Sequence, residues 1–190
     1  MLSQILRFLL DTLLGFFVFV LLARFYLQVM RAPFRNPVGQ FVTALTNWLV
    51  LPARRLIPGM FGLDLASFLL AWLTEALLLL LLYLLKGGGA GPAAGMLAGV
   101  LLLLALLELA RFSLYLLIGV VVIQAVISWI SPYAPLAPLF NALAAPILRP
   151  FRRLVPLVGN VDLSPLLALV AGQLLLIPLE YLVSAVAALL

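Results

Sequence analysis

Four long apolar stretches run through the chain, and shorter polar or proline-containing segments separate them. A helix needs about 20 apolar residues to cross a hydrocarbon core of roughly 30 Å, and each stretch is long enough. The pattern predicts membrane-spanning helices at about 5–30, 65–85, 111–130 and 165–189. A signal peptide is the alternative for the first stretch because Arg7 precedes it, but the run is long and lacks a clean cleavage site.

Residues 38–49 show a different pattern, in which apolar side chains recur at helical spacing and uncharged polar side chains take the other face. The whole segment from residue 38 to the proline at 52 has about 14 residues and is short for a span, so we expect an amphipathic helix that lies in the membrane interface or enters the membrane part-way. Residues 136–147 repeat the spacing. Pro52 and Pro58 bracket the arginine pair at 54–55, and we expect them to prevent one continuous helix.

The second half of the chain resembles the first half at a constant offset of 98 residues. Matching leucines carry little information in such an apolar chain, whereas matching prolines, arginines and aspartates carry much. These matches are Pro37 and Pro135, Pro52 and Pro150, Arg54 and Arg152, Arg55 and Arg153, Pro58 and Pro156, and Asp64 and Asp162. We therefore predict two repeats, at 1–86 and 97–190, with a Gly-rich connector at 87–96.

The segment before the third span allows more than one interpretation. A single helix over 97–130 would be about 50 Å long at ~1.5 Å per residue, which exceeds the thickness of the hydrocarbon core. We expect residues 111–130 to cross the membrane and residues 97–107 to protrude or lie in the interface. A separate helix over 93–110, or a fifth span, would need a turn at 108–111, where no Gly or Pro marks one.

Composition supports an integral membrane protein, because 67% of the residues are apolar and only 9% are charged. Most of the 11 basic residues lie in or beside the two linkers within the repeats. With four spans both linkers emerge on one side, so the repeats are parallel, and the positive-inside rule places that side in the cytoplasm. Both termini of this inner-membrane protein are then periplasmic. Basic residues beside apolar spans indicate anionic lipid as a partner and not nucleic acid.

The repeated arginine pair and the aspartate that follows it are the strongest candidate site. A guanidinium group matches the geometry of phosphate and carboxylate, so the pair suits a lipid headgroup or a partner protein. These candidate binding residues are Arg54, Arg55, Arg152 and Arg153. The alternative role is structural: Asp64 and Asp162 cap the helices that follow or form ion pairs, while the arginines anchor the linkers at the phosphates.

Ionisable groups inside the apolar spans are the second candidate, because such groups are costly in a membrane and often mark a pathway. Glu75 lies near the middle of the second span, Gln173 is its counterpart, and Glu180 follows Gln173. These residues suggest a polar path for an ion. The alternative is that Glu75 is protonated, or bonded across a helix interface to an arginine, Gln28, Gln124 or Thr74. Glu108 and Arg111 are expected to form a local ion pair.

Nothing in the sequence indicates catalysis. The chain contains no Cys and no His, which removes thiol chemistry, disulfides, the common soft metal sites and the usual acid–base group near neutral pH. It has no phosphate-binding loop and no paired acidic dyad. We therefore expect no enzymatic activity, no cofactor and no metal.

The duplicated Pro-x-Arg-Arg-Leu-x-Pro motif with its following aspartate, at 52–67 and 150–165, resembles the YggT family of bacterial membrane proteins, whose chloroplast relatives are called YlmG. The exit from the third span at 128–132 is similar as well. One departure is Ala66-Ser67, which stands where the second copy has Ser164-Pro165. The resemblance implies four spans and a role in osmotic or extracytoplasmic stress, ion homeostasis, division or the assembly of membrane complexes.

We therefore expect a non-enzymatic membrane scaffold, assembly factor or stress factor, whose basic face contacts anionic lipid, other membrane proteins or a second copy of the chain. The alternative, from a different class, is a small ion channel or transporter with a polar path near Glu75 and Gln173. A channel requires these two side chains to converge on a polar cavity. A scaffold requires them to be sealed by partners.

Overall fold

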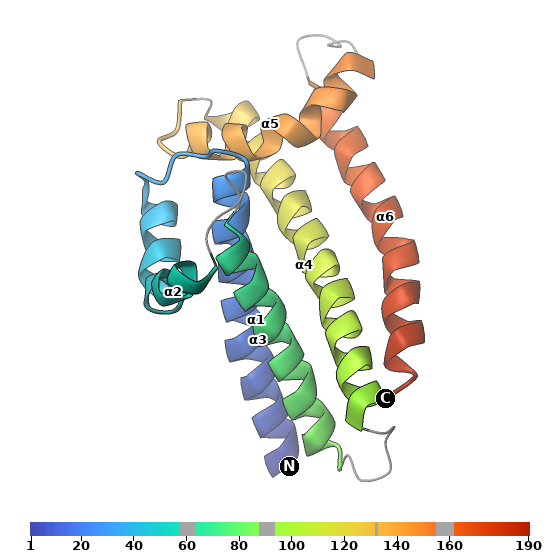
Figure 1. The fold of residues 1–190 in the computed structure, drawn as a ribbon. Helices are drawn as coiled ribbons and strands as arrows, with labels where there is room; N and C mark the ends of the chain where they lie inside the picture. The colour runs from blue at the N-terminus through green and yellow to red at the C-terminus, as the bar shows by residue number, and fades with distance from the viewer. Residues whose placement is uncertain (58–63, 88–93, 132, 155–161) are drawn as a thin grey trace.

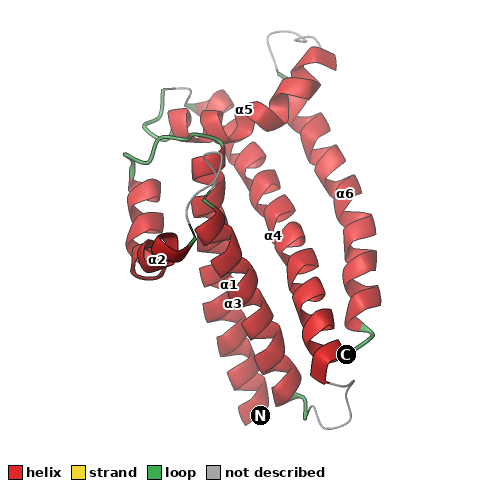
Figure 2. Ribbon diagram, in the orientation of Figure 1, coloured by secondary structure: helices red, strands yellow, loops and turns green. Residues whose placement is uncertain are grey.

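A computed structural model of the protein describes residues 1–57, 64–87, 94–131, 133–154 and 162–190. Within these ranges the chain is all-helical and shows no strand (Figure 2). The helices are α1 (Leu2–Val29), α2 (Pro37–Leu56), α3 (Leu65–Leu85), α4 (Ala94–Ile130), α5 (Ala137–Leu154) and α6 (Ser164–Ala187). Four of them, α1, α3, α4 and α6, are long and apolar enough to cross a membrane, which confirms the predicted class of multi-pass α-helical membrane protein.

The four long helices alternate in direction and lie side by side, with α4 between α3 and α6 (Figure 1). Both termini lie at one end of this bundle, which we call the terminal end. Helices α2 and α5 and the beginnings of α3 and α6 lie toward the opposite end, which we call the distal end. The two linkers that carry the arginine pairs are therefore on the same side of the bundle.

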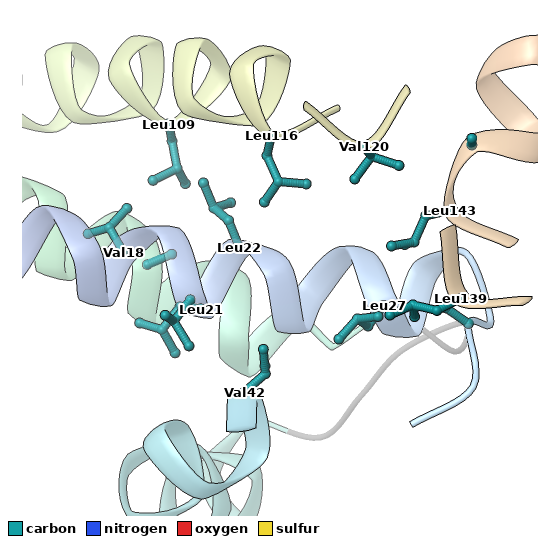
Figure 3. Close-up of a cluster of buried hydrophobic side chains, with 14 of the residues drawn as sticks. Val18, Leu21, Leu22, Leu27, Val42, Leu109, Leu116, Val120, Leu139 and Leu143 are labelled. Atoms are coloured by element: carbon teal, nitrogen blue, oxygen red, sulfur yellow. The ribbon is translucent and has the colours of Figure 1, made fainter. Parts of the chain in front are cut away.

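The core of the bundle forms around the C-terminal half of α1. Its members include Val18, Leu21, Leu22 and Leu27 of α1, Val42 of α2, Leu109, Leu116 and Val120 of α4, and Leu139 and Leu143 of α5 (Figure 3). Lipid chains are as apolar as leucine, so close van der Waals packing, and not transfer out of water, is what favours these contacts inside a membrane. Helix α2 thus packs on α1, whereas α5 packs mainly on α4 and α6 and adds Leu139 and Leu143 to the same core.

Helix α2 is longer than the sequence pattern predicts. Asn36 caps its start by accepting a hydrogen bond from the Gly39 N–H at 2.9 Å. The expectation that Pro52 and Pro58 prevent a continuous helix is wrong at Pro52, because α2 passes through it and its last turn contains the arginine pair 54–55. A proline inside a helix removes one N–H and often bends the helix without ending it. Pro58 lies outside the described residues.

Helix α5 behaves in the same way. It passes through Pro146 and Pro150, and its last turn contains the second arginine pair at 152–153. Figure 1 shows its ribbon changing direction toward the C-terminal end, as expected for a helix with internal prolines. Pro156 lies outside the described residues.

Helix α4 is continuous over its 37 residues, so residues 94–110 do not form a separate helix and no turn occurs at 108–111. The expectation that residues 97–107 protrude or lie in the interface is wrong. Leu101 and Leu104 are buried, and the indole N–H of Trp72 on α3 donates a hydrogen bond to the Leu102 carbonyl at 2.9 Å. This part of α4 lies along α3 because its leucines find an apolar helix surface there.

Candidate functional site

The first arginine–aspartate pair joins the end of α2 to the start of α3. Arg54 donates from Nη2 to Asp64 Oδ2 at 2.6 Å and from Nε to Oδ1 at 3.2 Å, which is a two-point contact. Arg54 Nη2 also donates to Gln28 Oε1 of α1 at 2.9 Å. Asp64 in turn caps α3, because it accepts bonds from the Ser67 hydroxyl at 2.6 Å and the Ser67 N–H at 3.3 Å. One carboxylate therefore fixes the ends of two helices.

A further arginine, Arg24 of α1, belongs to the same site. Its side chain is 5% exposed, and its Nε lies 3.6 Å from Asp64 Oδ2. Its Nη1 donates hydrogen bonds to Thr46 Oγ1 at 2.6 Å and to Asn47 Oδ1 at 2.8 Å, both on α2. The sequence does not single out Arg24 as a site residue. The available signal is its position within an apolar span, where an ionised side chain calls for a partner.

The buried carboxylate of Asp64 stays ionised because of these neighbours. Burial by itself raises the pKa of Asp64, but hydrogen bonds from Arg54 and Ser67 outweigh it, so the pKa lies below its ordinary value of 3.8. Two guanidinium groups share this one carboxylate, which leaves the site with a net positive charge. In the described part of the chain, Arg24 Nε has no hydrogen-bond partner.

The second arginine–aspartate pair is simpler and more exposed. Arg152 Nε donates to Asp162 Oδ2 at 2.9 Å, and the two side chains are 48% and 26% exposed. The Ser164 N–H donates to Asp162 Oδ1 at 2.9 Å. Burial raises the pKa of Asp162, but contacts with Ser164 and Arg152 lower it below its ordinary value. This pair also connects a short helix to the span that follows it.

The two pairs differ in what surrounds them. The residues 98 positions after Arg24, Gln28, Thr46, Asn47 and Ser67 are Val122, Val126, Ala144, Ala145 and Pro165. The second half therefore keeps the arginine–aspartate pair but lacks counterparts of Arg24 and of the four other side chains that bond around the first pair. Three of these differences are chemically consistent with one another, since the two hydrogen-bond partners of Arg24, Thr46 and Asn47, are replaced by alanine where the buried guanidinium is absent.

Within each doublet, the second arginine has a different environment from the first. Arg55 and Arg153 are exposed, and neither forms a salt bridge within the described ranges. The exposed arginines toward the distal end that form no salt bridge within the described ranges, which we call the distal arginines, are Arg31, Arg35, Arg55, Arg149 and Arg153. The four candidate binding residues thus divide into Arg54 and Arg152, which form salt bridges, and Arg55 and Arg153, which form none within the described ranges. Arg152 is nevertheless exposed, like Arg153.

Glu75, a residue of the candidate polar path, lies in a different part of the bundle from the arginine–aspartate pairs, toward the terminal end. A cavity of about 780 Å³ lies between α1, α3, α4 and the last residues of the chain. Glu75 lines it, is 3% exposed, and has no hydrogen-bond partner for Oε2 among the described residues. We call this space the Glu75 cavity. Its other charged lining residues are Arg7, Asp11, Lys86, Glu108 and Arg111.

Gln173 and Glu180 do not line the Glu75 cavity. Both are exposed on α6, and Glu180 Oε1 accepts a hydrogen bond from the Tyr115 hydroxyl at 3.1 Å. Glu75 and Gln173 therefore do not meet in the Glu75 cavity. The predicted ion pair between Glu108 and Arg111 is confirmed, with 2.6 Å between Oε2 and Nη2.

The other partners considered for Glu75 are engaged elsewhere. Gln28 accepts from Arg54, the Thr74 hydroxyl donates to the Leu70 carbonyl, and Gln124 donates to Asn141 Oδ1. Over the described ranges, no group of three or more acidic side chains is arranged to hold a metal ion. Glu75 is thus a buried carboxyl group that faces a cavity and makes no hydrogen bond through Oε2.

Comparison with known proteins supplies the family. The CCB3/YggT family model matches residues 3–85 and 103–183. The chain is 39% identical over 170 residues to an uncharacterised protein of Pseudomonas aeruginosa, which covers 88% of this chain and 84% of that protein. It is 35% identical over 166 residues to the uncharacterised protein YggT of Escherichia coli, with coverage of 85% and 82%. No solved structure gives a significant match. Because the family model matches two segments of the chain and these relatives match most of its length, the chain belongs to the CCB3/YggT family.

Proposed function

We propose that the protein is a non-enzymatic inner-membrane scaffold, assembly or stress factor whose distal arginines bind anionic lipid headgroups. The division of each arginine doublet carries this proposal. Arg54 and Arg152 form salt bridges with Asp64 and Asp162, which precede α3 and α6, whereas the next residues, Arg55 and Arg153, are exposed and form no salt bridge within the described ranges. Successive residues on a helix point about 100° apart, so the second arginine of each doublet is directed away from the aspartate that the first one binds.

The chemistry of the distal arginines suits a membrane surface. A guanidinium group is weakly hydrated and binds phosphate oxygens through two parallel hydrogen bonds. Each basic residue near an anionic leaflet contributes about 1 kcal/mol of attraction at ordinary ionic strength. The excess of arginine at the distal end also supports a cytoplasmic distal end and periplasmic termini under the positive-inside rule.

We propose further that the chain consists of two parallel repeats, α1–α3 and α4–α6, with α2 and α5 as interfacial helices. The two segments matched by the family model support this duplication, as do the two arginine–aspartate pairs at the same spacing. Helix α2 buries one face and exposes Trp48 on another, and tryptophan is enriched where membrane meets water.

Self-association through α6 is the second part of the proposed scaffold role. Gln173 and Glu180 are exposed on this span, and polar side chains facing lipid are costly unless another helix covers them. An amide group both donates and accepts hydrogen bonds, so Gln173 can pair with the same residue of a second copy across a two-fold axis. This complementarity favours a second copy of the chain as the occupant.

Lipid binding can be measured with the protein's own tryptophans. Trp48 and Trp129 are 68% and 64% exposed, so brominated lipid that surrounds the protein quenches their fluorescence. The experiment compares brominated phosphatidylglycerol with brominated phosphatidylcholine in vesicles. We expect stronger quenching by the anionic lipid, and a smaller preference in the double variant Arg55→Gln, Arg153→Gln and at high salt.

The matched control is Arg7→Gln, which removes an exposed arginine from the terminal end. We expect this variant to keep the anionic preference of the native protein. Unchanged preference in the double variant would refute the role of the distal arginines in lipid binding.

A small ion channel or transporter is the second candidate function, and the Glu75 cavity is the observation that favours it. Gln173 and Glu180, which lie outside that cavity, do not extend it into a path across the bundle. Ion flux in liposomes tests this candidate with the native protein and Glu75→Gln. Flux that the substitution abolishes would support a channel, and no flux above empty vesicles would remove it.

A further inference from the structure

We propose that the Glu75 cavity binds a single positively charged group, an alkali-metal ion or a primary ammonium, through the Glu75 carboxylate. This site lies at the terminal end of the bundle and uses none of the distal arginines, so it is separate from the lipid-binding role proposed above. Charge, burial and space at the cavity each support the proposal.

The charges that line the cavity leave Glu75 without a partner. Glu108 and Arg111 of α4 pair at 2.6 Å, and Arg7 and Asp11 of α1 pair at 3.7 Å. Lys86 lies 11 residues after Glu75 on α3, about 16 Å away along the helix axis at ~1.5 Å per residue. The charged side chains that line the cavity balance when all are ionised, but the positive charge left over for Glu75 is that of the distant Lys86.

Burial makes the negative charge of Glu75 costly. Glu75 is 3% exposed, and its Oε2 has no hydrogen-bond partner in the described part of the chain. A carboxylate in an apolar span without compensation costs several kcal/mol, so it must hold either a proton or another cation. A carboxyl group that is always protonated can be packed among apolar side chains and needs no space beside it.

The space beside Glu75 favours the bound cation. The cavity of about 780 Å³ is many times the ~30 Å³ that one water molecule occupies in the liquid. It therefore has room for an ion with part of its hydration shell or for an organic ammonium group. The salt bridge between Glu108 and Arg111 holds that guanidinium on Glu108, so Arg111 does not pair with Glu75.

Carbodiimide labelling of the native protein in vesicles tests the site directly. A protonated carboxyl group transfers its proton to dicyclohexylcarbodiimide and adds to the central carbon, and the product rearranges to a stable N-acylurea. Mass spectrometry of peptides measures this adduct at each carboxyl group. A cation bound to Glu75 displaces the proton and protects the residue, whereas Glu180, exposed and outside the cavity, serves as the internal control.

Sodium, potassium and ethylammonium chlorides are the probes. We expect at least one of them to slow labelling of Glu75 by the factor 1 + [L]/Kd, about fivefold at roughly four times Kd, and to leave Glu180 unchanged. Protection by sodium or potassium identifies an inorganic ion as the ligand. Protection by ethylammonium alone identifies the ammonium group of an organic molecule.

Two results would overturn the proposal. Equal labelling of Glu75 in all the salts means that the carboxyl group holds a proton and binds none of the cations. No labelling of Glu75 in any buffer means that its carboxyl group exchanges neither a proton nor a cation with the medium. As a further check, Arg111→Gln removes a positive charge from the cavity and should lower the cation concentration that gives half protection. Arg35→Gln, at the distal end, should leave that concentration unchanged.

Discussion

Arg24 Nε lies 3.6 Å from Asp64 Oδ2, and both side chains are almost completely buried where α1, α2 and α3 meet. Arg54 reaches the same carboxylate from the outer side, so Asp64 is held between two guanidinium groups. A buried charge is tolerated when its partners are in place and becomes costly when one partner is removed. The junction therefore depends on a set of side chains and not on any single contact.

The first prediction concerns the replacement of Arg24 by the residue found at the equivalent position of the second half. Arg24→Val leaves Thr46 and Asn47 without their hydrogen-bond donor, and Asp64 with one cation fewer. We expect the free energy of unfolding to fall by about 3 kcal/mol, the low end for breaking a buried pair. Unfolding in mixed micelles titrated with sodium dodecyl sulfate measures the change.

A triple variant provides the control for this prediction. Arg24→Val with Thr46→Ala and Asn47→Ala copies the apolar set at 122, 144 and 145. Removing all the polar partners together leaves fewer of them unsatisfied, so the triple variant should be more stable than Arg24→Val alone. A triple variant that is as unstable as the sum of its single substitutions would show that the three residues do not act as one network.

The second prediction is the acid sensitivity that Asp64 gives to the fold. Because the folded protein holds the pKa of Asp64 below its ordinary value of 3.8, the unfolded chain binds a proton more readily. Stability from this group is therefore complete above the ordinary value and is lost as pH falls through the lower folded value. Unfolding measured from pH 6 to about pH 2 should show a steeper loss for the native protein than for Asp64→Asn.

The comparison with Asp162→Asn sharpens this test. Asp162 also has a lowered pKa, but its side chain is 26% exposed against 2% for Asp64. Solvent screens the more exposed pair, so Asp162→Asn should change the loss of unfolding free energy at low pH less than Asp64→Asn does. A larger effect at 162 than at 64 would contradict the view that the buried network dominates.

The sequence reveals the arginine–aspartate pairs because rare residue types recur at one spacing. It does not reveal the role of Arg24, since the partners Thr46 and Asn47 come from another helix whose packing register no repeat shows. The sequence also does not show that α2 continues through Pro52. The last turn of α2 continues beyond this proline because Arg54 is tied to Asp64, and such a tertiary contact is invisible in a local pattern.

The apolar stretches fix which segments become long helices, but not which face of each helix meets its neighbours. Gln173 illustrates this limit. Its correspondence with Glu75 suggested a shared path, yet α6 packs on α4 with Gln173 on the exposed side. The rotation of a helix about its own axis decides whether a polar residue lines a cavity or faces lipid. That rotation is set by the packing of the helix against its neighbours, which a single-sequence pattern does not show.

The third prediction concerns the tight turn that sets α2 against α1. A Cβ added at Gly39 would collide with the backbone carbonyl of Phe34, which cannot move aside as a flexible side chain can. Gly39→Ala should therefore lower the free energy of unfolding by about 1–3 kcal/mol. At Gly15 an added Cβ meets nothing within 4 Å, so Gly15→Ala should stabilise the helix by about 0.5–1 kcal/mol. Equal effects of the two substitutions would contradict the close approach at Gly39.

The fourth prediction follows from the exposed polar residues of α6. The chain contains no cysteine, so a single introduced cysteine reports contacts without background. If two copies associate through Gln173, the variant Gln173→Cys should form a disulfide-linked dimer under oxidising conditions in vesicles. The matched control is Leu176→Cys, because Leu176 is 4% exposed and lies on the side of α6 that packs within the bundle. Cross-linking at 173 but not at 176 supports the proposed interface. Its absence at 173 at high protein-to-lipid ratio would exclude a second copy as the occupant and would direct the search to a different membrane helix.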